Sequence, residues 1–204
     1  MTRLGILLSG RGSNFLAIAS NIASGKLKAE IAIVISNCED AAGIAAAQAR
    51  GLKTLVLPSK GRKREEHDRA VVLALREAGA ELVILAGYMR LLSPWFVQQF
   101  PGKILNIHPS LLPSFPGLEA QKQALEYGVQ VSGCTVHFVD EHLDHGAIVL
   151  QKAVPVLPFD DEHTLADRIL VQEHIAYSEA IALVATGNYR MNGRRVLPDS
   201  GNGA

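Results

Sequence analysis

The fold is decided by one short stretch near the N-terminus, which reads Leu4-Gly5-Ile6-Leu7-Leu8-Ser9-Gly10-Arg11-Gly12-Ser13-Asn14. The residues up to Leu8 form an unbroken apolar run, which is typical of a strand buried on both faces of a parallel sheet. The small residues that follow predict a tight loop, and from Ser13 to Ala23 apolar side chains recur near helical spacing. The stretch therefore predicts a strand, a glycine loop and a helix in direct succession.

The same alternation of strand and helix continues through the first half of the chain. Further apolar runs, each predicted as a strand, lie at 31–35, 55–57, 82–86 and 104–107. Helical patterns lie at 41–50 and 62–78. Buried strands that alternate with helices of this length predict parallel βαβ units.

The second half has a different character. Residues 110–117 are rich in proline and leucine and cannot form a regular helix. Helices are predicted at 118–127 and 161–186, with Asp160 or Asp161 as the N-cap of the longer one. Strands at 134–139 and 147–156 are expected to be antiparallel, and the tail at 190–204 adds a small edge strand. The fold class is α/β, a mostly parallel twisted sheet flanked by helices, with a Rossmann-like first half and antiparallel strands in the second.

Length and charge limit the classes of partner. The chain has 204 residues, with 20 basic and 20 acidic side chains. This balance gives no electrostatic footprint for nucleic acid and no basic face for a membrane. No run approaches the roughly 18 apolar residues that span a bilayer, and no signal region precedes the first strand. Cys38 and Cys134 are predicted to be buried free thiols, so we expect a cytoplasmic protein without nucleic-acid or membrane partners.

The glycine loop at residues 9–14 is a candidate phosphate site. Small residues let a ligand approach the backbone, and the amides of the first helical turn point into the loop. A dinucleotide fingerprint is disfavoured because Phe15 stands where its third glycine would be, and no lysine follows to make a Walker loop. A single phosphate is the better match. The alternative, a plain turn capped by Ser13 or Asn14, stays open on spacing alone.

Asn106 and His108 are the strongest candidates for chemistry. They lie two apart at the carboxyl end of an apolar strand, so their side chains share one face at the edge where α/β sheets bind ligands. An amide can stabilise a developing oxyanion, and an imidazole can carry a proton. The pair therefore suits acyl transfer to an amine, a reaction that needs no serine or cysteine nucleophile.

Asp144 lies in the loop between the two later strands, at 140–146. Near His108 it would orient the imidazole ring, whereas otherwise it would be one carboxylate of a solvated turn. The loop also mixes carboxylates with histidines, His137, His142 and His145. Because their spacing matches no zinc pattern, no metal site is predicted.

In these residues and in the motifs given below, the chain resembles the phosphoribosylglycinamide formyltransferases, a branch of the folate-dependent formyltransferase family. The resemblance runs from Leu4 to about Leu197. It rests on Ser9-Gly10-x-Gly12-Ser13-Asn14, Leu85-Ala86-Gly87-Tyr88-Met89-Arg90, Asn106-Ile107-His108-Pro109-Ser110-Leu111-Leu112-Pro113, and Val136-His137-Phe138-Val139 leading to Leu143-Asp144. The asparagine–histidine string is shared across the family, while the phosphate loop is typical of this branch.

The resemblance implies a role for each matching residue. The implied catalytic residues are Asn106, His108 and Asp144. The implied substrate contacts are Gly12, Ser13 and Asn14 at the phosphate, Gln172 and Glu173 at the ribose, and Gly87 and Pro109 at the glycinamide. The implied folate contacts are Arg64, Met89, Arg90, Leu91, Leu92, Asn106, Val139, Asp140, Glu141, His142, Leu143 and Asp144. Without the resemblance, Glu173 and Arg64 would be ordinary surface charges.

The activity that the resemblance implies is transfer of a formyl group from 10-formyltetrahydrofolate to the amine of 5'-phosphoribosylglycinamide, a step of purine biosynthesis. Its partners would be these two small molecules, with 10-formyltetrahydrofolate as co-substrate and no metal. The chain would be one formyltransferase domain, 1–204, with a phosphate-binding half (1–100) and a catalytic, folate-binding half (101–204), as a monomer or homodimer. The alternatives are a formyltetrahydrofolate hydrolase or a formyltransferase for another amine. Two residues depart from the family, His145 and Glu119.

Overall fold

A computed structural model describes residues 1–199. The chain divides into two compact units. The N-terminal unit comprises Met1–Asn106 and Val139–Glu141, and the C-terminal unit comprises Ile107–Phe138 and the chain from His142 onward. The predicted domain and its edge strand extend to Ala204, but residues 200–204 lie outside the described part of the chain.

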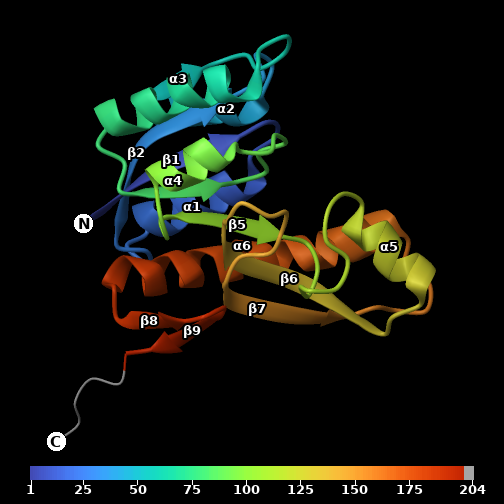
Figure 1. Cartoon of the computed structure of the whole chain (residues 1–204). Helices are drawn as coiled ribbons and strands as arrows, with labels where there is room; N and C mark the ends of the chain where they lie inside the picture. The colour runs from blue at the N-terminus through green and yellow to red at the C-terminus, as the bar shows by residue number, and fades with distance from the viewer. Residues whose placement is uncertain (200–204) are drawn as a thin grey trace, which may run out of the picture. The chain divides into compact units, whose positions relative to one another are not determined.

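The N-terminal unit is built on parallel strands (Figure 1). These are β1 (Thr2–Leu8), β2 (Ala29–Ser36), β3 (Thr54–Val56), β4 (Leu82–Leu85) and, up to Asn106, β5 (Ile104–His108), in the order β3-β2-β1-β4-β5. The helices are α1 (Ser13–Ala23), α2 (Ala42–Gln48), α3 (Arg64–Glu77) and α4 (Pro94–Gln99). The chain leaves β1 toward β2 and later returns to β4 on the other side of β1. This reversal is the topological switch point at which such sheets bind ligands.

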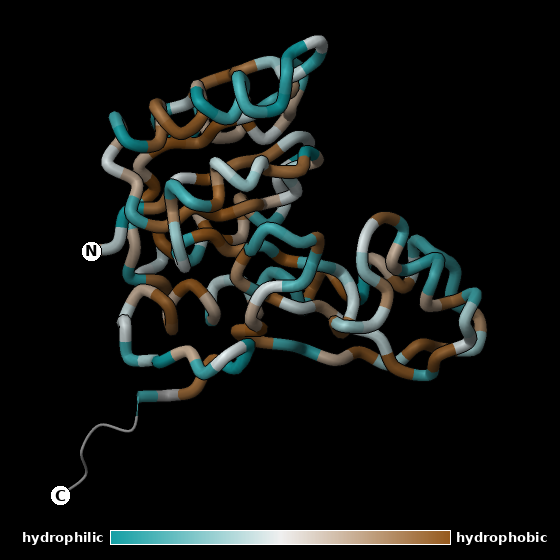
Figure 2. Tube along the Cα trace, viewed as in Figure 1, coloured by the Kyte–Doolittle hydropathy of each residue, from teal (hydrophilic) through white to brown (hydrophobic). Residues whose placement is uncertain are grey.

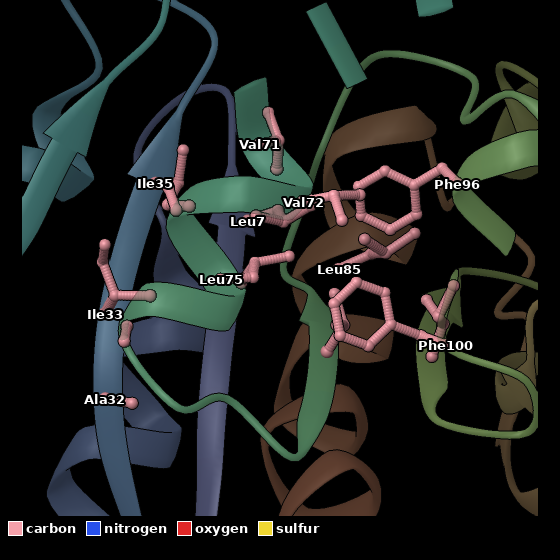
Figure 3. Packing of buried hydrophobic residues seen from close by; sticks show 14 residues of the cluster. Leu7, Ala32, Ile33, Ile35, Val71, Val72, Leu75, Leu85, Phe96 and Phe100 are labelled. Atoms are coloured by element: carbon pink, nitrogen blue, oxygen red, sulfur yellow. The ribbon is translucent and has the colours of Figure 1, made fainter. Parts of the chain in front are cut away.

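Side-chain alternation along β1 divides its contacts between the two faces of the sheet. Leu7 belongs to the buried cluster that α3 and α4 complete, to which Val71, Val72, Leu75, Phe96 and Phe100 contribute (Figure 3). Gly5 lies on the same face, where a Cβ would come 2.2 Å from Leu75 Cδ2, so α3 packs directly on the backbone. Leu8, on the opposite face, packs against Gly12 and Gly43 at the starts of α1 and α2.

The hydropathy pattern along the chain follows these faces. Figure 2 shows brown, apolar segments along the strands and an alternation of teal and brown along α3. Its buried side chains include His67 and Asp68 in addition to the apolar residues. The amphipathic pattern of α3 therefore carries two polar residues into the interior.

The C-terminal unit pairs a long helix with antiparallel strands. Its elements are α5 (Ala120–Tyr127), β6 (Val131–Phe138), β7 (Ile148–Pro155), α6 (Glu162–Thr186), β8 (Tyr189–Asn192) and β9 (Arg195–Pro198). β6 and β7 are antiparallel, β9 is parallel to β7, and β8 and β9 form an antiparallel pair. α6 packs on β6 and β7. Asp161 caps α6, because its carboxylate accepts the Thr164 N–H at 2.8 Å.

Most sequence predictions of structure are confirmed, with element ends shifted by a few residues. The α/β class, the parallel first half and the antiparallel later strands are present. The helix α4 was not predicted; it has only 6 residues and begins at Pro94 after a Ser93 cap. Both cysteines are free, but Cys38 is half-buried, so its predicted burial was wrong. Within residues 1–199, no helix is long and apolar enough to cross a membrane.

Asp68 joins α3 to the start of α4. Its side chain is fully buried, and Oδ2 accepts the Ser93 N–H at 2.7 Å. Burial raises the pKa of this carboxyl, but the adjacent His67 imidazole and the hydrogen bonding of Ser93 outweigh burial and hold the pKa below its usual value. Asp68 is therefore an ionised anchor for the residues between β4 and α4.

We predict that Asp68→Asn lowers the free energy of unfolding by about 1–3 kcal/mol at pH 7, because a buried N–H loses a charged acceptor. Since the folded-state pKa of Asp68 is lowered, its contribution is complete above pH about 4 and is lost as the pH falls through the folded-state value. Urea unfolding at pH 7 and pH 3 should therefore show a smaller difference at the lower pH. The control is Asp167→Asn, at an exposed position of α6. Equal free energies of unfolding for the two variants would contradict the stabilising role of Asp68.

Candidate active site

The glycine loop meets α1 through a residue without a side chain. Gly12 is the N-cap of α1, with a left-handed backbone (φ 72), and no side chain caps the helix. The first turn contains no acidic residue. Neither Ser13 nor Asn14 is therefore the N-cap of α1. An α-helix start of this kind presents its N–H groups and the positive end of its dipole to an anion.

Close packing reserves the Gly12 position for glycine. A Cβ there would lie 3.2 Å from Gly43 Cα and 3.2 Å from Leu8 Cδ2. Gly43 N–H also donates to the Gly10 carbonyl at 3.0 Å, so the starts of α1 and α2 are joined by backbone. Only glycine therefore fits at position 12 without displacing its neighbours.

The chain after β4 lies directly beside this loop. The Ser9 N–H donates to the Gly87 carbonyl at 3.0 Å, and the Met89 N–H donates to Ser9 Oγ at 2.7 Å. Met89 is 74% exposed and Leu91 54% exposed. Apolar side chains left open at a sheet edge are suited to contact a flat ligand. The structure thus brings the expected phosphate loop and part of the expected folate wall together.

His108 and Asp144 meet in the C-terminal unit. His108 Nδ1 lies 3.4 Å from Asp144 Oδ2, and both side chains are more than nine-tenths buried. Asp144 Oδ2 also accepts the Gly117 N–H at 2.8 Å, and Oδ1 lies 3.7 Å from His137 Nε2. Asp144 is therefore a buried carboxylate beside two imidazoles, and the solvated-turn alternative is wrong.

The opposite ring nitrogen of His108 also has a partner. His108 Nε2 lies 2.8 Å from the Phe115 carbonyl. A carbonyl and a carboxylate are both acceptors, so each ring nitrogen of His108 lies beside an acceptor oxygen. Phe115 (φ 52) and Asp144 (φ 48) both have left-handed backbones, which are uncommon for residues other than glycine. Such conformations concentrate at functional sites, where the surrounding structure enforces them.

A buried threonine holds the irregular loop that delivers the Phe115 carbonyl. Thr135 of β6 donates to the Ser110 carbonyl at 2.7 Å and accepts the Leu112 N–H at 3.0 Å. Gln151 of β7 donates to Thr135 Oγ1 and to the Leu112 carbonyl, both at 2.9 Å. The Leu112–Pro113 peptide is cis. Two strands thus supply the hydrogen bonds that the proline-rich backbone cannot make within itself.

Glu173 is buried, unlike the ordinary surface glutamate that its sequence context suggested. Its exposed fraction is 8%, and it faces β6 from α6. Burial, together with the nearby Glu173 charge, raises the pKa of the Cys134 thiol to about 12. Gln172, which precedes Glu173 on α6, is half-buried.

The remaining expected site residues divide between the two units. Arg64, Glu141, His142 and Leu143 are exposed, and Asn106, Pro109, Val139 and Asp140 are half-buried. His142 and His145 are in ring contact, with centroids 5.1 Å apart. The hydrogen bonds made by Ser9, Thr135 and the Phe115 carbonyl were not predicted from the sequence. The first two are ordinary polar residues, and a backbone carbonyl leaves no sequence signal.

This chain is similar to known formyl transferases. The family model described as Formyl transferase matches residues 2–181. The phosphoribosylglycinamide formyltransferase of Escherichia coli is 41% identical over 188 residues, which are 92% of this chain and 89% of that one. The crystal structure of glycinamide ribonucleotide transformylase 1 from Symbiobacterium toebii matches with a TM-score of 0.94 and 48% identity, covering 97% of this chain and 94% of that chain.

A longer relative contains the same region. The trifunctional purine biosynthetic protein adenosine-3 of Drosophila pseudoobscura pseudoobscura is 48% identical over 191 residues, which are 92% of this chain and 14% of that protein. The chain thus spans about a seventh of the length of that insect protein. The chain belongs to the formyl transferase family, and its class is that of a folate-dependent formyltransferase enzyme.

We predict that Gly12→Ala weakens binding of ribose 5-phosphate about tenfold or more, because the added methyl group must displace the loop from Gly43 and Leu8. Isothermal titration calorimetry measures the affinity. Gly25→Ala is the matched control, since Gly25 has the same left-handed backbone (φ 74) but nothing within 4 Å of its Cβ position. Equal affinity of the two variants would remove the loop from phosphate binding.

Proposed function

We propose that this enzyme transfers the formyl group of 10-formyltetrahydrofolate to the amine of 5'-phosphoribosylglycinamide, as a step of de novo purine biosynthesis in the cytoplasm. The observation that carries the proposal is the buried pair of His108 and Asp144, beside an irregular loop held by Thr135. Formylation of this amine is also supported by the names of relatives that match nearly the whole chain.

The reaction joins the acceptor amine to the formyl carbon and releases the folate nitrogen. The amine lone pair attacks the carbonyl carbon, a C–N bond forms, and the oxygen becomes negative. The bond from carbon to the folate N10 then breaks, and the proton lost by the amine balances the proton gained by N10. Asn106 would donate to the oxyanion, and His108 would serve the proton transfers.

Asp144 would hold the His108 imidazole in the orientation that the reaction requires. The carboxylate lies at Nδ1, so it would fix the ring orientation and stabilise a proton there. That arrangement leaves the Nε2 proton as the one available for transfer. In the described structure this nitrogen faces the Phe115 carbonyl, so the loop at 109–117 would have to yield that position to the reacting groups.

Substrate binding would use the remaining residues that the resemblance implies. Gly12, Ser13 and Asn14 would hold the phosphate, and Gln172 and Glu173 the ribose hydroxyls. Gly87 and Pro109 would contact the glycinamide through backbone groups. The folate would contact Arg64, the segments 89–92 and 139–144, and Asn106. These two small molecules are the only partners that the proposed reaction requires. The protein would act as a monomer or homodimer and would use no metal.

One assay separates this function from its alternatives. Purified protein is mixed with 10-formyltetrahydrofolate, and tetrahydrofolate release is followed with and without 5'-phosphoribosylglycinamide. Release only with the acceptor is the expected result. Equal release in both tubes would instead indicate a hydrolase, and release only with another amine would change the acceptor.

We predict that Asn106→Ala lowers kcat about 10²–10³-fold and that His108→Ala and Asp144→Ala lower it about 10²–10⁴-fold. The dissociation constant for 5'-phosphoribosylglycinamide should change far less, because none of the three residues is among its proposed contacts. His163→Ala is the control, since His163 is exposed in the first turn of α6. Unchanged turnover in the His108 and Asp144 variants would remove both residues from the mechanism.

A further inference from the structure

The segment Gly87–Ser93, between β4 and α4, has no regular secondary structure. Side chains from other parts of the N-terminal unit hold its backbone instead. Ser9 Oγ accepts the Met89 N–H and Asp68 Oδ2 accepts the Ser93 N–H, each at 2.7 Å. In between, the Arg90 guanidinium donates to the carbonyls of Ser59 and Arg62 at 3.4 and 3.3 Å. The exposed side chains of Met89 and Leu91 thus stand on a backbone fixed at both ends.

Ser9 holds this segment by two bonds from one residue. Its backbone N–H donates to the Gly87 carbonyl, which extends the β1–β4 pairing beyond the last residues of the strands. Gly87 then turns through a left-handed backbone (φ 75), so the Met89 N–H returns to the Ser9 hydroxyl. The turn is therefore closed around Ser9.

The Ser9 hydroxyl is itself oriented by a buried amide. Ser9 Oγ donates to Asn37 Oδ1, and Asn37 Nδ2 donates to Ser59 Oγ at 3.1 Å. Asn37 is 8% exposed. The bonds from Met89 to Ser9, Asn37 and Ser59 all run in one donor direction, and such chains polarise one another. With its proton committed to Asn37, the Ser9 oxygen presents a lone pair to Met89.

We propose that Ser9 is a positioning residue for the folate: its hydroxyl fixes the backbone at Met89 and thereby the exposed surface of the Met89–Leu92 segment. The proposal rests on the proposed function, in which this segment contacts the folate. Ser9 itself would touch neither the folate nor the reacting atoms. Its removal should therefore weaken folate binding while leaving the helix N-terminus that receives phosphate intact.

The test compares Ser9→Ala with Ser24→Ala in the full chain. Ser24 is exposed at the end of α1 and makes only a local bond to the Asn21 carbonyl, so it matches the chemical change without the contact. Tetrahydrofolate and inorganic phosphate are titrated separately into each variant. Loss of one neutral hydrogen bond should raise the tetrahydrofolate Kd about 3- to 10-fold in Ser9→Ala, with the phosphate Kd within about twofold of wild type. Ser24→Ala should match wild type for both.

A second measurement reads the bond itself. Exchange of the Met89 amide hydrogen, followed by NMR, should accelerate about tenfold in Ser9→Ala, with amides of β4 unchanged. Asn37→Ala removes the acceptor that orients Ser9. It should raise the tetrahydrofolate Kd and the Met89 exchange rate by smaller factors, and it replaces Ser9→Ala in the test if that variant does not fold.

Three results would overturn the inference. They are a tetrahydrofolate Kd in Ser9→Ala equal to wild type, an unchanged Met89 exchange rate, or equal loss of phosphate and folate affinity, which would indicate general disruption. Failure of the wild-type chain to bind tetrahydrofolate would overturn the proposed function instead. The wild-type titration alone decides that point, so the two failures are distinguishable.

Discussion

The parallel pairing of β1 with β4 is the constraint on which the N-terminal unit depends. It runs from Leu4 opposite Leu82 to Leu7 opposite Leu85, and its last bond joins Ser9 to Gly87. Because the chain leaves β1 and β4 toward opposite sides of the sheet, the two loops after these strands meet at a place that no other strand covers. One loop leads to the uncapped start of α1 and the other carries exposed apolar side chains.

Backbone conformation matters as much as side-chain identity in this protein. At Gly12 a left-handed backbone lets α1 begin without a side-chain cap, so its dipole and amides face the loop. At Phe115 and Asp144 the same conformation occurs in residues with side chains, and there it directs a carbonyl and a carboxylate to the two nitrogens of His108. Hydrogen bonds from Thr135 and Gln151 stabilise the loop before Phe115, so neighbouring strands compensate for its irregular path.

Two buried polar side chains of the N-terminal unit form hydrogen bonds with loops and not with strands. Asp68 and Asn37 are both nearly inaccessible, and each bonds to a segment that has no ladder of its own. A buried polar side chain is costly unless it is hydrogen-bonded. Asp68 accepts the Ser93 backbone N–H, and Asn37 bonds to the hydroxyls of Ser9 and Ser59. The exposed Met89–Leu92 surface is consequently supported from the interior.

Sequence alone determined the features that depend on local periodicity. The apolar runs fixed β1, β2 and β4, and strand alternation placed Asn106 and His108 on one face, because side-chain direction follows directly from backbone repeat. Sequence could not decide whether Asp144 was buried or solvated, nor that Glu173 was buried, because each depends on which distant element packs against it. It also gave no sign of the hydrogen bonds that the Ser9 hydroxyl and the Phe115 carbonyl make across loops. Only the tertiary structure brings these groups together, since hydrogen bonding of irregular backbone is a property of the folded arrangement and not of the residues taken singly.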